Sequence, residues 1–165
     1  GAQNDYKPYE FEYEWEVPTM ASFGEGYRFH ITGLVHDYAG FPSNLPKVIW
    51  RQLKHLHNKV ARNADKIGHW EEFMLDDAEI VVVAYGSSAR AAKEAVIRER
   101  ARGVRVGLFR PITIWPFPET VLAALVDRII AIIVPELNMG QIRREVERCA
   151  GGQAQVFGAL SLIHI

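Results

Sequence analysis

Three short runs of apolar residues constrain the fold of this chain more than any other feature of its sequence. They span residues 80–85, 104–109 and 129–134, and valine and isoleucine dominate them. Runs of this length that are apolar at nearly every position are typical of parallel β-strands covered by helices on both faces. The sequence therefore predicts an α/β fold with a mainly parallel open sheet.

Amphipathic segments separate these runs and predict the connecting helices. The helices are expected over residues 88–102, 118–125 and 140–150, and a last short strand over residues 154–157. Ser87 or Ser88 is the expected N-cap of the first helix, and Gly103 ends it. This β-α-β order requires right-handed crossovers, so the predicted architecture is a three-layer sandwich whose parallel strands end at one edge.

The region before the first apolar run has a different character. Residues 1–41 are rich in aromatic residues, glycine and proline, and predict an extended arm with loops. Aromatic residues alternate with glutamates over residues 10–16, the period of an extended segment with one apolar face. Apolar residues then recur at helical spacing and predict a long amphipathic helix over residues 45–67. We therefore expect an arm with a linker helix, residues 1–76, and an α/β domain, residues 77–165.

Composition disfavours several classes of protein. Lysine and arginine total 19 against 20 aspartates and glutamates, and a formal net charge of -1 argues against general binding to nucleic acid. The single cysteine cannot form an internal disulfide, and the sequence has no signal-peptide pattern and no long apolar stretch. We therefore expect a cytoplasmic protein that binds neither nucleic acid nor membrane. Gly1 and Ala2 in place of an initiator methionine favour a processed chain or part of a longer one.

A turn after the first apolar run is a candidate anion site. Gly86, Ser87 and Ser88 stand where a strand ends and a helix begins, where free backbone N–H groups attract anions. The same three residues are also what a tight turn before a helix requires. A single glycine satisfies neither the dinucleotide-binding motif nor the phosphate loop. The turn is therefore either structural, which is the commoner case, or a phosphate site.

The histidines and the cysteine form no recognisable metal or catalytic set. His55 and His57 lie two residues apart on the predicted helix and point about 200° apart, so they cannot share one ion. We expect both on the helix surface. His36 and Asp37 are adjacent in a loop, where an aspartate commonly stabilises a turn. Cys149 falls late in a predicted helix and is expected to pack as a small apolar residue.

Two segments at predicted strand exits are candidates for contact with a partner. Glu136, Asn138 and Gln141 follow the third apolar run and open the next helix, where a carboxylate orders a loop or contributes to an interface. Trp115 and Phe117 alternate with prolines after the second run. The prolines make this segment rigid, which favours docking because little entropy is lost on binding.

Four stretches of the chain together resemble the alpha subunits of 2-oxoacid:ferredoxin oxidoreductases, particularly the 2-oxoglutarate type. They are YRFHITGLVHD at residues 27–37, VAYGSSAR at 83–90, GLFRPITIWPFP at 107–118 and ELNMGQ at 136–141. The combination in this order is specific, although each stretch alone is not. The region resembles a transketolase C-terminal-like domain together with the linker that leads into it. Two features depart from the family: Tyr38 replaces an expected acidic residue, and residues 158–165 do not resemble the usual ending.

The resemblance implies part of a larger enzyme. The complex of this family oxidatively decarboxylates a 2-oxoacid to its acyl-coenzyme A and passes the electrons to ferredoxin. It uses thiamine diphosphate, magnesium and iron-sulfur clusters, and we expect none of these in this chain, whose one cysteine cannot hold a four-cysteine cluster. The implied partners are the beta subunit, the thiamine-associated domain of the alpha subunit, ferredoxin and coenzyme A.

We therefore expect a structural, assembly role for this chain, with no catalytic residue of its own. The candidate interface residues are Trp15, His36, Asp37, Leu53, Trp115, Phe117, Glu136, Asn138 and Gln141. Apolar stripes on the arm and on the long helix also predict self-association, most simply as a two-fold dimer. The alternative is a self-standing α/β enzyme or a binding module for a phosphorylated small molecule, with the turn at Gly86 as its site.

Overall fold

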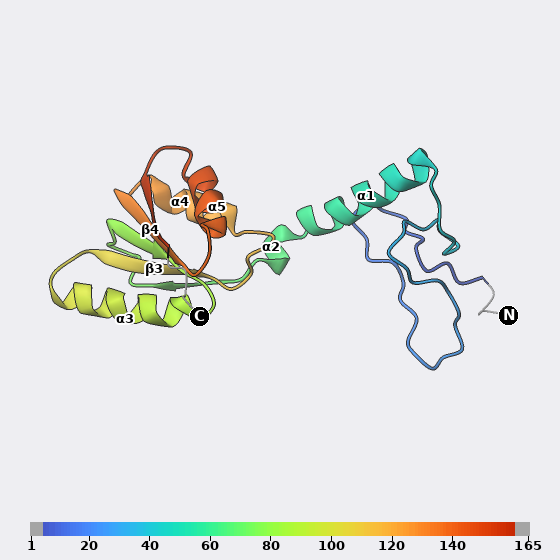
Figure 1. Ribbon diagram of the computed structural model, residues 1–165, viewed down its shortest axis with the longest axis horizontal. Helices are drawn as coiled ribbons and strands as arrows, with labels where there is room; N and C mark the ends of the chain where they lie inside the picture. Colours follow the sequence, from blue (N-terminus) through green and yellow to red (C-terminus); the bar gives the residue numbers. More distant parts are fainter. Residues whose placement is uncertain (1–4, 161–165) are drawn as a thin grey trace. The chain divides into compact units, whose positions relative to one another are not determined.

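The computed structural model describes residues 5–160 of the chain. The chain divides into two compact units, Gly1–Asn63 and Ala64–Ile165. The helices are α1 (Pro46–Ala61), α2 (Ala64–Ile67), α3 (Ser88–Ala101), α4 (Glu119–Val126) and α5 (Gln141–Ala150) (Figure 1). The strands are β1 (Trp70–Phe73), β2 (Ile80–Val83), β3 (Val106–Pro111), β4 (Ala131–Glu136) and β5 (Gln155–Leu160).

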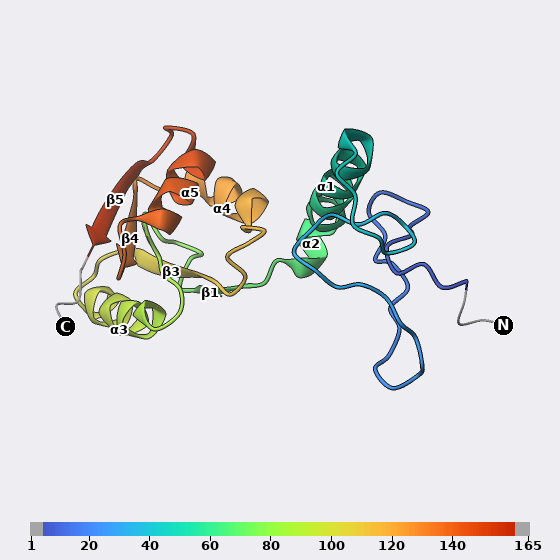
Figure 2. The same cartoon turned by 45° about the vertical axis from the view of Figure 1, so that its right-hand side comes forward.

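Within the described residues, the second unit is built on one five-stranded sheet. Its order is β1-β3-β2-β4-β5, with β1 antiparallel to β3 and all other neighbours parallel. Helix α3 lies on one face, and helices α4 and α5 lie on the other (Figure 2). This arrangement confirms the predicted three-layer α/β sandwich.

Each face of the sheet has its own apolar core. On the side of α4 and α5, strand residues pack against the two helices, and the buried members include Val81, Val83, Phe109, Leu122, Ile132, Val134, Ile142 and Val146. On the side of α3, the buried cluster comprises Val82, Ala84, Ala89, Ala92, Val96, Val106 and Leu108. Alternate residues of β2 thus face opposite cores, which is why its sequence is apolar at every position.

Strand β1 is an element that the sequence did not indicate. Its residues are mostly exposed, and Glu71 pairs with Arg110 of the adjacent strand β3 at 2.9 Å. A short edge strand with charged side chains lacks the apolar pattern of a central strand. Because β1 belongs to the sheet, the compact units divide between residues 63 and 64, whereas the sequence suggested a division after residue 76.

The first unit consists of an irregular arm and helix α1. Residues 5–44 contain no strand, only an isolated bridge between His36 and Pro42. The alternation over residues 10–16 therefore does not produce an extended segment with one covered face. Instead the Glu16 carboxylate accepts hydrogen bonds from the backbone N–H groups of Glu12 and Tyr13, which folds this stretch into a turn.

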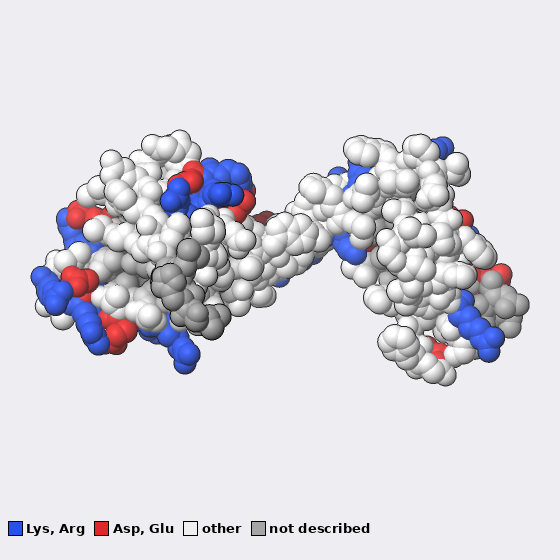
Figure 3. Space-filling view, viewed as in Figure 1, with Lys and Arg blue, Asp and Glu red and all other residues white. Residues whose placement is uncertain are grey.

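Helix α1 is shorter than predicted and keeps an apolar face exposed within its unit. The expected helix over residues 45–67 is interrupted after Ala61, and α2 follows as a separate turn. The arm covers the side of α1 that carries Gln52 and His55, while Trp50, Leu53 and Leu56 are more than half exposed. Charged side chains are sparse on the face of this unit seen in Figure 3. No helix in the described residues is long and apolar enough to cross a bilayer.

Candidate functional site

The candidate site lies where the parallel strands β2, β3 and β4 end at one edge of the sheet. Strands β2 and β4 are neighbours, yet α3 leaves β2 toward one face and α5 leaves β4 toward the other. In α/β proteins, such a point opens a crevice where ligands or partners bind. The turn at residues 86–88 and the loop at residues 137–140 meet here, so predicted residues from two strand exits come together.

Glu136 is a buried carboxylate that holds the start of α5. Only 2% of the residue is exposed. Its Oε1 accepts a hydrogen bond from the backbone N–H of Ile142 at 2.9 Å, and its Oε2 accepts one from Arg143 at 2.9 Å. These N–H groups lie in the first turn of α5, where donors have no partner within the helix. The carboxylate therefore caps α5 and complements the positive end of its dipole.

Tyr85 and Asn138 complete the hydrogen bonding around Glu136. The Tyr85 hydroxyl donates to Glu136 Oε1 at 3.3 Å, and the Asn138 amide donates to the Tyr85 hydroxyl at 2.8 Å. Burial and the neighbouring Glu136 charge raise the pKa of Tyr85, so its hydroxyl remains a donor. Asn138 Oδ1 accepts from the N–H groups of Gly140 and Gln141. Tyr85 was missed from sequence because only the pairing of β2 with β4 brings it to Glu136.

The turn at residues 86–88 is stabilised by its glycine conformation and by a local hydrogen bond. Gly86 has a φ of 56°, in the left-handed region that glycine adopts without strain. Ser87 occupies the N-cap position, but its side chain makes no cap hydrogen bond. The Ser88 hydroxyl donates to the Tyr85 carbonyl at 2.7 Å. Ser87 is thus the N-cap residue, as one of the two predicted positions, but no serine side chain caps the helix, and Ser88 bonds back to Tyr85 instead.

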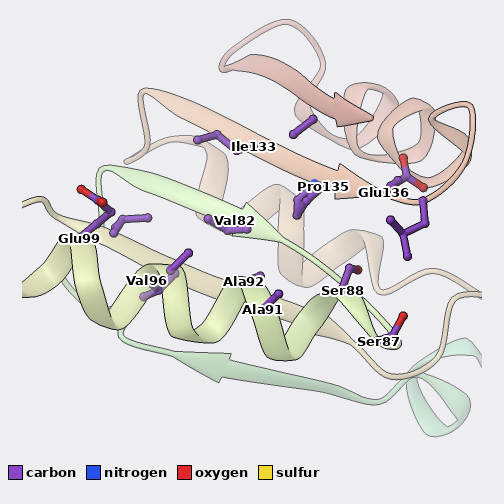
Figure 4. Close-up of a pocket in the computed structure, with 14 residues that line it drawn as sticks. Val82, Ser87, Ser88, Ala91, Ala92, Val96, Glu99, Ile133, Pro135 and Glu136 are labelled. Carbon is purple, nitrogen blue, oxygen red and sulfur yellow. The ribbon is translucent and has the colours of Figure 1, made fainter. Parts of the chain in front are cut away.

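An apolar groove of about 630 Å³ runs from this edge along α3, over β4 and β5 (Figure 4). Its apolar lining comprises Val82, Ala91, Ala92, Ala95, Val96, Val106, Ile133, Pro135, Leu137 and Ala159. Ser87 and Glu136 lie at one end of the groove and Glu99 at the other. The groove lies between α3 and the strands because α3 packs mainly over β3 and makes fewer contacts with β2 and β4. The sequence did not reveal it, since the position of α3 over the sheet is a tertiary feature.

The chemistry of the groove disfavours an anion. Its lining contains two carboxylates, Glu99 and Glu136, and no lysine or arginine. A phosphate at the turn would meet these negative charges with no cation to offset them, although a helix N-terminus is close. Among residues 5–160, no group of three or more His, Cys, Asp or Glu side chains could hold a metal ion. Burial raises the pKa of the Cys149 thiol to about 11, which matches a packing residue and not a nucleophile.

The other predicted contact residues of the second unit have mixed environments. Trp115 is 69% exposed, and it precedes Pro116 through a cis peptide bond. Phe117 instead packs against the core on the side of α4 and α5. Gln141 is exposed at the start of α5, with its N–H bonded to Asn138. Trp115 and Gln141 therefore remain available for contacts, while Phe117 is a partly buried anchor for its loop.

The predicted contact residues of the first unit lie in the arm and on α1. His36 is buried, stacks on Tyr9 with ring centroids 4.8 Å apart, and has its Nε2 3.0 Å from Thr32 Oγ1. Asp37 Oδ1 accepts from the N–H of Phe41 at 3.0 Å. Both residues therefore order the loop that contains them.

Two more predicted contact residues of this unit are accessible. Trp15 stacks on Tyr13, and the Arg62 guanidinium lies over its ring at 4.2 Å. Trp15 nevertheless stays 40% exposed, and Leu53 is 51% exposed on the open face of α1. These two side chains therefore belong to the surface of the unit, whereas His36 belongs to its interior.

His55 corrects one expectation for this unit. We expected it on the helix surface, but it is 2% exposed and stacks on Phe11 with centroids 3.7 Å apart. Its Nδ1 lies 3.0 Å from the Glu14 carbonyl oxygen. Burial lowers the pKa of His55, so the imidazole is neutral in the folded unit. The helical period alone did not show which side of α1 the arm would cover.

Comparison with known proteins connects this architecture to one family. Residues 78–161 match the family model described as pyruvate:ferredoxin oxidoreductase core domain II. The 2-oxoglutarate synthase subunit KorA of Methanocaldococcus jannaschii is 46% identical over 142 residues, which are 86% of this chain and 37% of that subunit. The chain therefore spans little more than a third of the length of this relative.

Two solved structures share the fold. A 2-oxoglutarate:ferredoxin oxidoreductase from Magnetococcus marinus superposes with a TM-score of 0.78 at 24% identity, over 97% of this chain and 28% of that chain. A split gene transketolase, described as an inactive beta4 tetramer, has a TM-score of 0.50 at 16% identity over 56% of this chain and 32% of that chain. At these identities, the two likenesses concern the fold alone.

Proposed function

The chain belongs to the pyruvate:ferredoxin oxidoreductase core domain II family, and we propose on that basis that it acts in the alpha subunit of a 2-oxoacid:ferredoxin oxidoreductase. Its role there is assembly: it braces the domain that carries the cofactor and packs against the beta subunit. The 46% identity with a 2-oxoglutarate synthase subunit favours 2-oxoglutarate as the 2-oxoacid.

The observation that supports this proposal is the hydrogen bonding at the edge of the sheet where the parallel strands end. The polar atoms of Tyr85, Glu136 and Asn138 bond to one another and to the start of α5. Beside them lies a groove with an apolar lining and no cation. The polar groups at this edge are already hydrogen-bonded, and the surface beside them is apolar and open. Such an edge suits the docking of a protein segment better than it suits a catalytic reaction.

The cofactors of the proposed complex do not fit the described residues. An iron-sulfur cluster of the common type takes four thiolates, and the chain has one cysteine. A diphosphate with magnesium needs cations or oxygen ligands around it, and the groove offers two separated carboxylates at its ends. We therefore assign thiamine diphosphate, magnesium and the clusters to other parts of the complex, where a 2-oxoacid would be oxidised to its acyl-coenzyme A and ferredoxin reduced.

The alternative function is a phosphate-binding enzyme or module that uses the turn at Gly86. The carboxylates of the groove and the hydrogen bond of Ser88 to Tyr85 both count against it. Among the described residues, no contact around the turn favours phosphate binding over the assembly role.

A chimera tests the proposed function. The matching region of M. jannaschii KorA is replaced by this chain, and the chimera is produced with the partner subunits of KorA. We expect a stable complex that reduces ferredoxin with 2-oxoglutarate and coenzyme A, above the level of KorA lacking this region. Ala95→Arg, in the groove, should impair assembly, whereas Ile97→Arg, on the exposed side of α3, should not. A folded chimera that does not associate with the partner subunits would overturn the proposal.

A further inference from the structure

Strand β5 leaves one edge of the sheet open. It pairs with β4 from Gln155 to Leu160, and no described strand lies on its other side. An open edge presents a row of unpaired backbone donors and acceptors, which is a template for pairing with another strand.

The direction of the unpaired groups follows from one hydrogen bond. The N–H of Gln155 donates to the carbonyl of Ile130, which leads into β4. Backbone groups of successive residues in a parallel strand point alternately to either side. The N–H and C=O groups of Val156, Gly158 and Leu160 therefore point away from β4, toward the open edge.

The two edges of the sheet differ in their protection. Strand β1 has four residues, among them Glu71 and Glu72, and such charges discourage pairing with another chain. Strand β5 has six residues, QVFGAL, with no charge and no proline. Phe157 is 52% exposed on it, and Ala159 lines the groove, so the edge continues into apolar surface. Arg143 of α5 lies over Gly158, and its guanidinium forms an ion pair with Glu147 at 2.9 Å. The residues of β5 themselves thus lack the charges and prolines that protect a solvated edge.

We propose that β5 pairs with the β5 of a second copy, antiparallel and about a two-fold axis, to join two sheets into one. A two-fold axis places the same strand on both sides of the interface, so the surface must be complementary to itself. The residues of β5 meet this condition because they place no like charges opposite one another, and the nearby Arg143 is paired with Glu147 of its own copy. The contact is small beside a standard interface of about 800 Å² per partner, so we expect weak, reversible dimerisation.

This pairing goes beyond the proposed function and is tested without it. Sedimentation velocity of the full chain over a range of micromolar concentrations should show a monomer–dimer equilibrium. Amide hydrogen exchange, resolved by residue, should show the N–H groups of Val156, Gly158 and Leu160 becoming protected as dimer forms. The N–H of Phe157, which faces β4, should be protected at all concentrations and thus reports that β5 is folded.

Matched variants separate this surface from others. Phe157→Lys places like charges near the axis and should weaken dimerisation by about tenfold or more. Trp70→Lys makes the same kind of change on the other edge strand and should leave the equilibrium unchanged. Leu53→Glu, on the exposed face of α1, tests self-association through the first unit. A chain that stays monomeric, or a dimer that is lost in Leu53→Glu while the outward amides of β5 keep exchanging, would overturn the pairing. If the chimera assembles and is active while the isolated chain stays monomeric, the pairing of β5 is wrong and the proposed function still stands.

Discussion

At the scale of single residues, Glu136 shows how a buried charge can serve the fold. A buried carboxylate is costly unless its oxygens are hydrogen-bonded. Glu136 accepts bonds from two backbone N–H groups of α5 and from the side chains of Tyr85 and Asn138. A residue that stands at a strand exit, where catalytic acids are often found, is here engaged in capping a helix.

We expect Glu136→Ala to lower the free energy of unfolding of the chain by about 2–4 kcal/mol, because it leaves buried N–H groups and the Tyr85 hydroxyl without their acceptor. Urea denaturation followed by circular dichroism measures this change. Glu145→Ala, which removes an exposed carboxylate from the same helix, is the control and should cost less than about 0.5 kcal/mol. A similar small cost for Glu136→Ala would contradict the capping role.

The burial of His55 predicts that the stability of the first unit depends on pH. Its pKa is lowered in the fold by burial, while the Glu14 carbonyl and the Glu14 and Glu16 charges oppose this shift and Lys59 adds to it. A lowered pKa means that protons bind the unfolded state more readily. The stability conferred by neutral His55 is therefore present above the unfolded pKa of about 6.5 and is lost as the pH falls through the folded pKa.

In a chain carrying Trp70→Phe and Trp115→Phe, the remaining tryptophans, Trp15 and Trp50, lie in the first unit. We expect their fluorescence to report loosening of this unit between about pH 7 and pH 5. His55→Phe keeps a ring on Phe11 without a titrating group, so it should flatten this profile. His57→Phe, at an exposed position, should not. A flat profile in the chain that retains His55 would show that His55 does not control the packing of the arm.

At the scale of elements, the start of α3 depends on backbone geometry more than on side-chain capping. The helix begins after a left-handed glycine, and its serines have different roles. We expect Ser88→Ala to cost about 0.5–1.5 kcal/mol through loss of its bond to Tyr85. Ser87→Ala should stay within about 0.5 kcal/mol. Equal costs in thermal or urea unfolding would mean that the two serines share one function.

Helix α1 shows that an amphipathic pattern does not decide which face of a helix is covered. Its sequence predicts an amphipathic helix, and such a helix must bury its apolar face. Within the first unit, the arm instead covers the side with Gln52 and His55, and leaves Leu53 and Leu56 exposed. The apolar face of α1 thus remains available for a partner or a second copy, and we retain self-association through it as a proposal.

At the scale of the whole molecule, the family model covers residues 78–161, while the similarity to the M. jannaschii subunit covers 86% of the chain and so extends into the first unit. We expect isothermal titration of the chain with thiamine diphosphate and magnesium to give no saturable binding at micromolar concentrations, because its groove lacks cations. The same titration of the assembled chimera with its partner subunits should show binding. Saturable micromolar binding to the chain alone would contradict the assignment of this cofactor to another part of the complex.

The sequence by itself determined the class of fold, because short runs such as residues 80–85 are apolar at every position, are rich in valine and isoleucine, and alternate with amphipathic segments, as the strands of a covered parallel sheet do. Its local motifs also indicated the family. Tertiary structure alone decided that β1 joins the sheet, that Tyr85 meets Glu136 and that a groove opens beside α3. Each of these three features depends on contacts between residues that are distant in sequence. The period of apolar residues indicates only the environment of one segment, so it could not predict such contacts. Which face of α1 the arm covers was undetermined for the same reason.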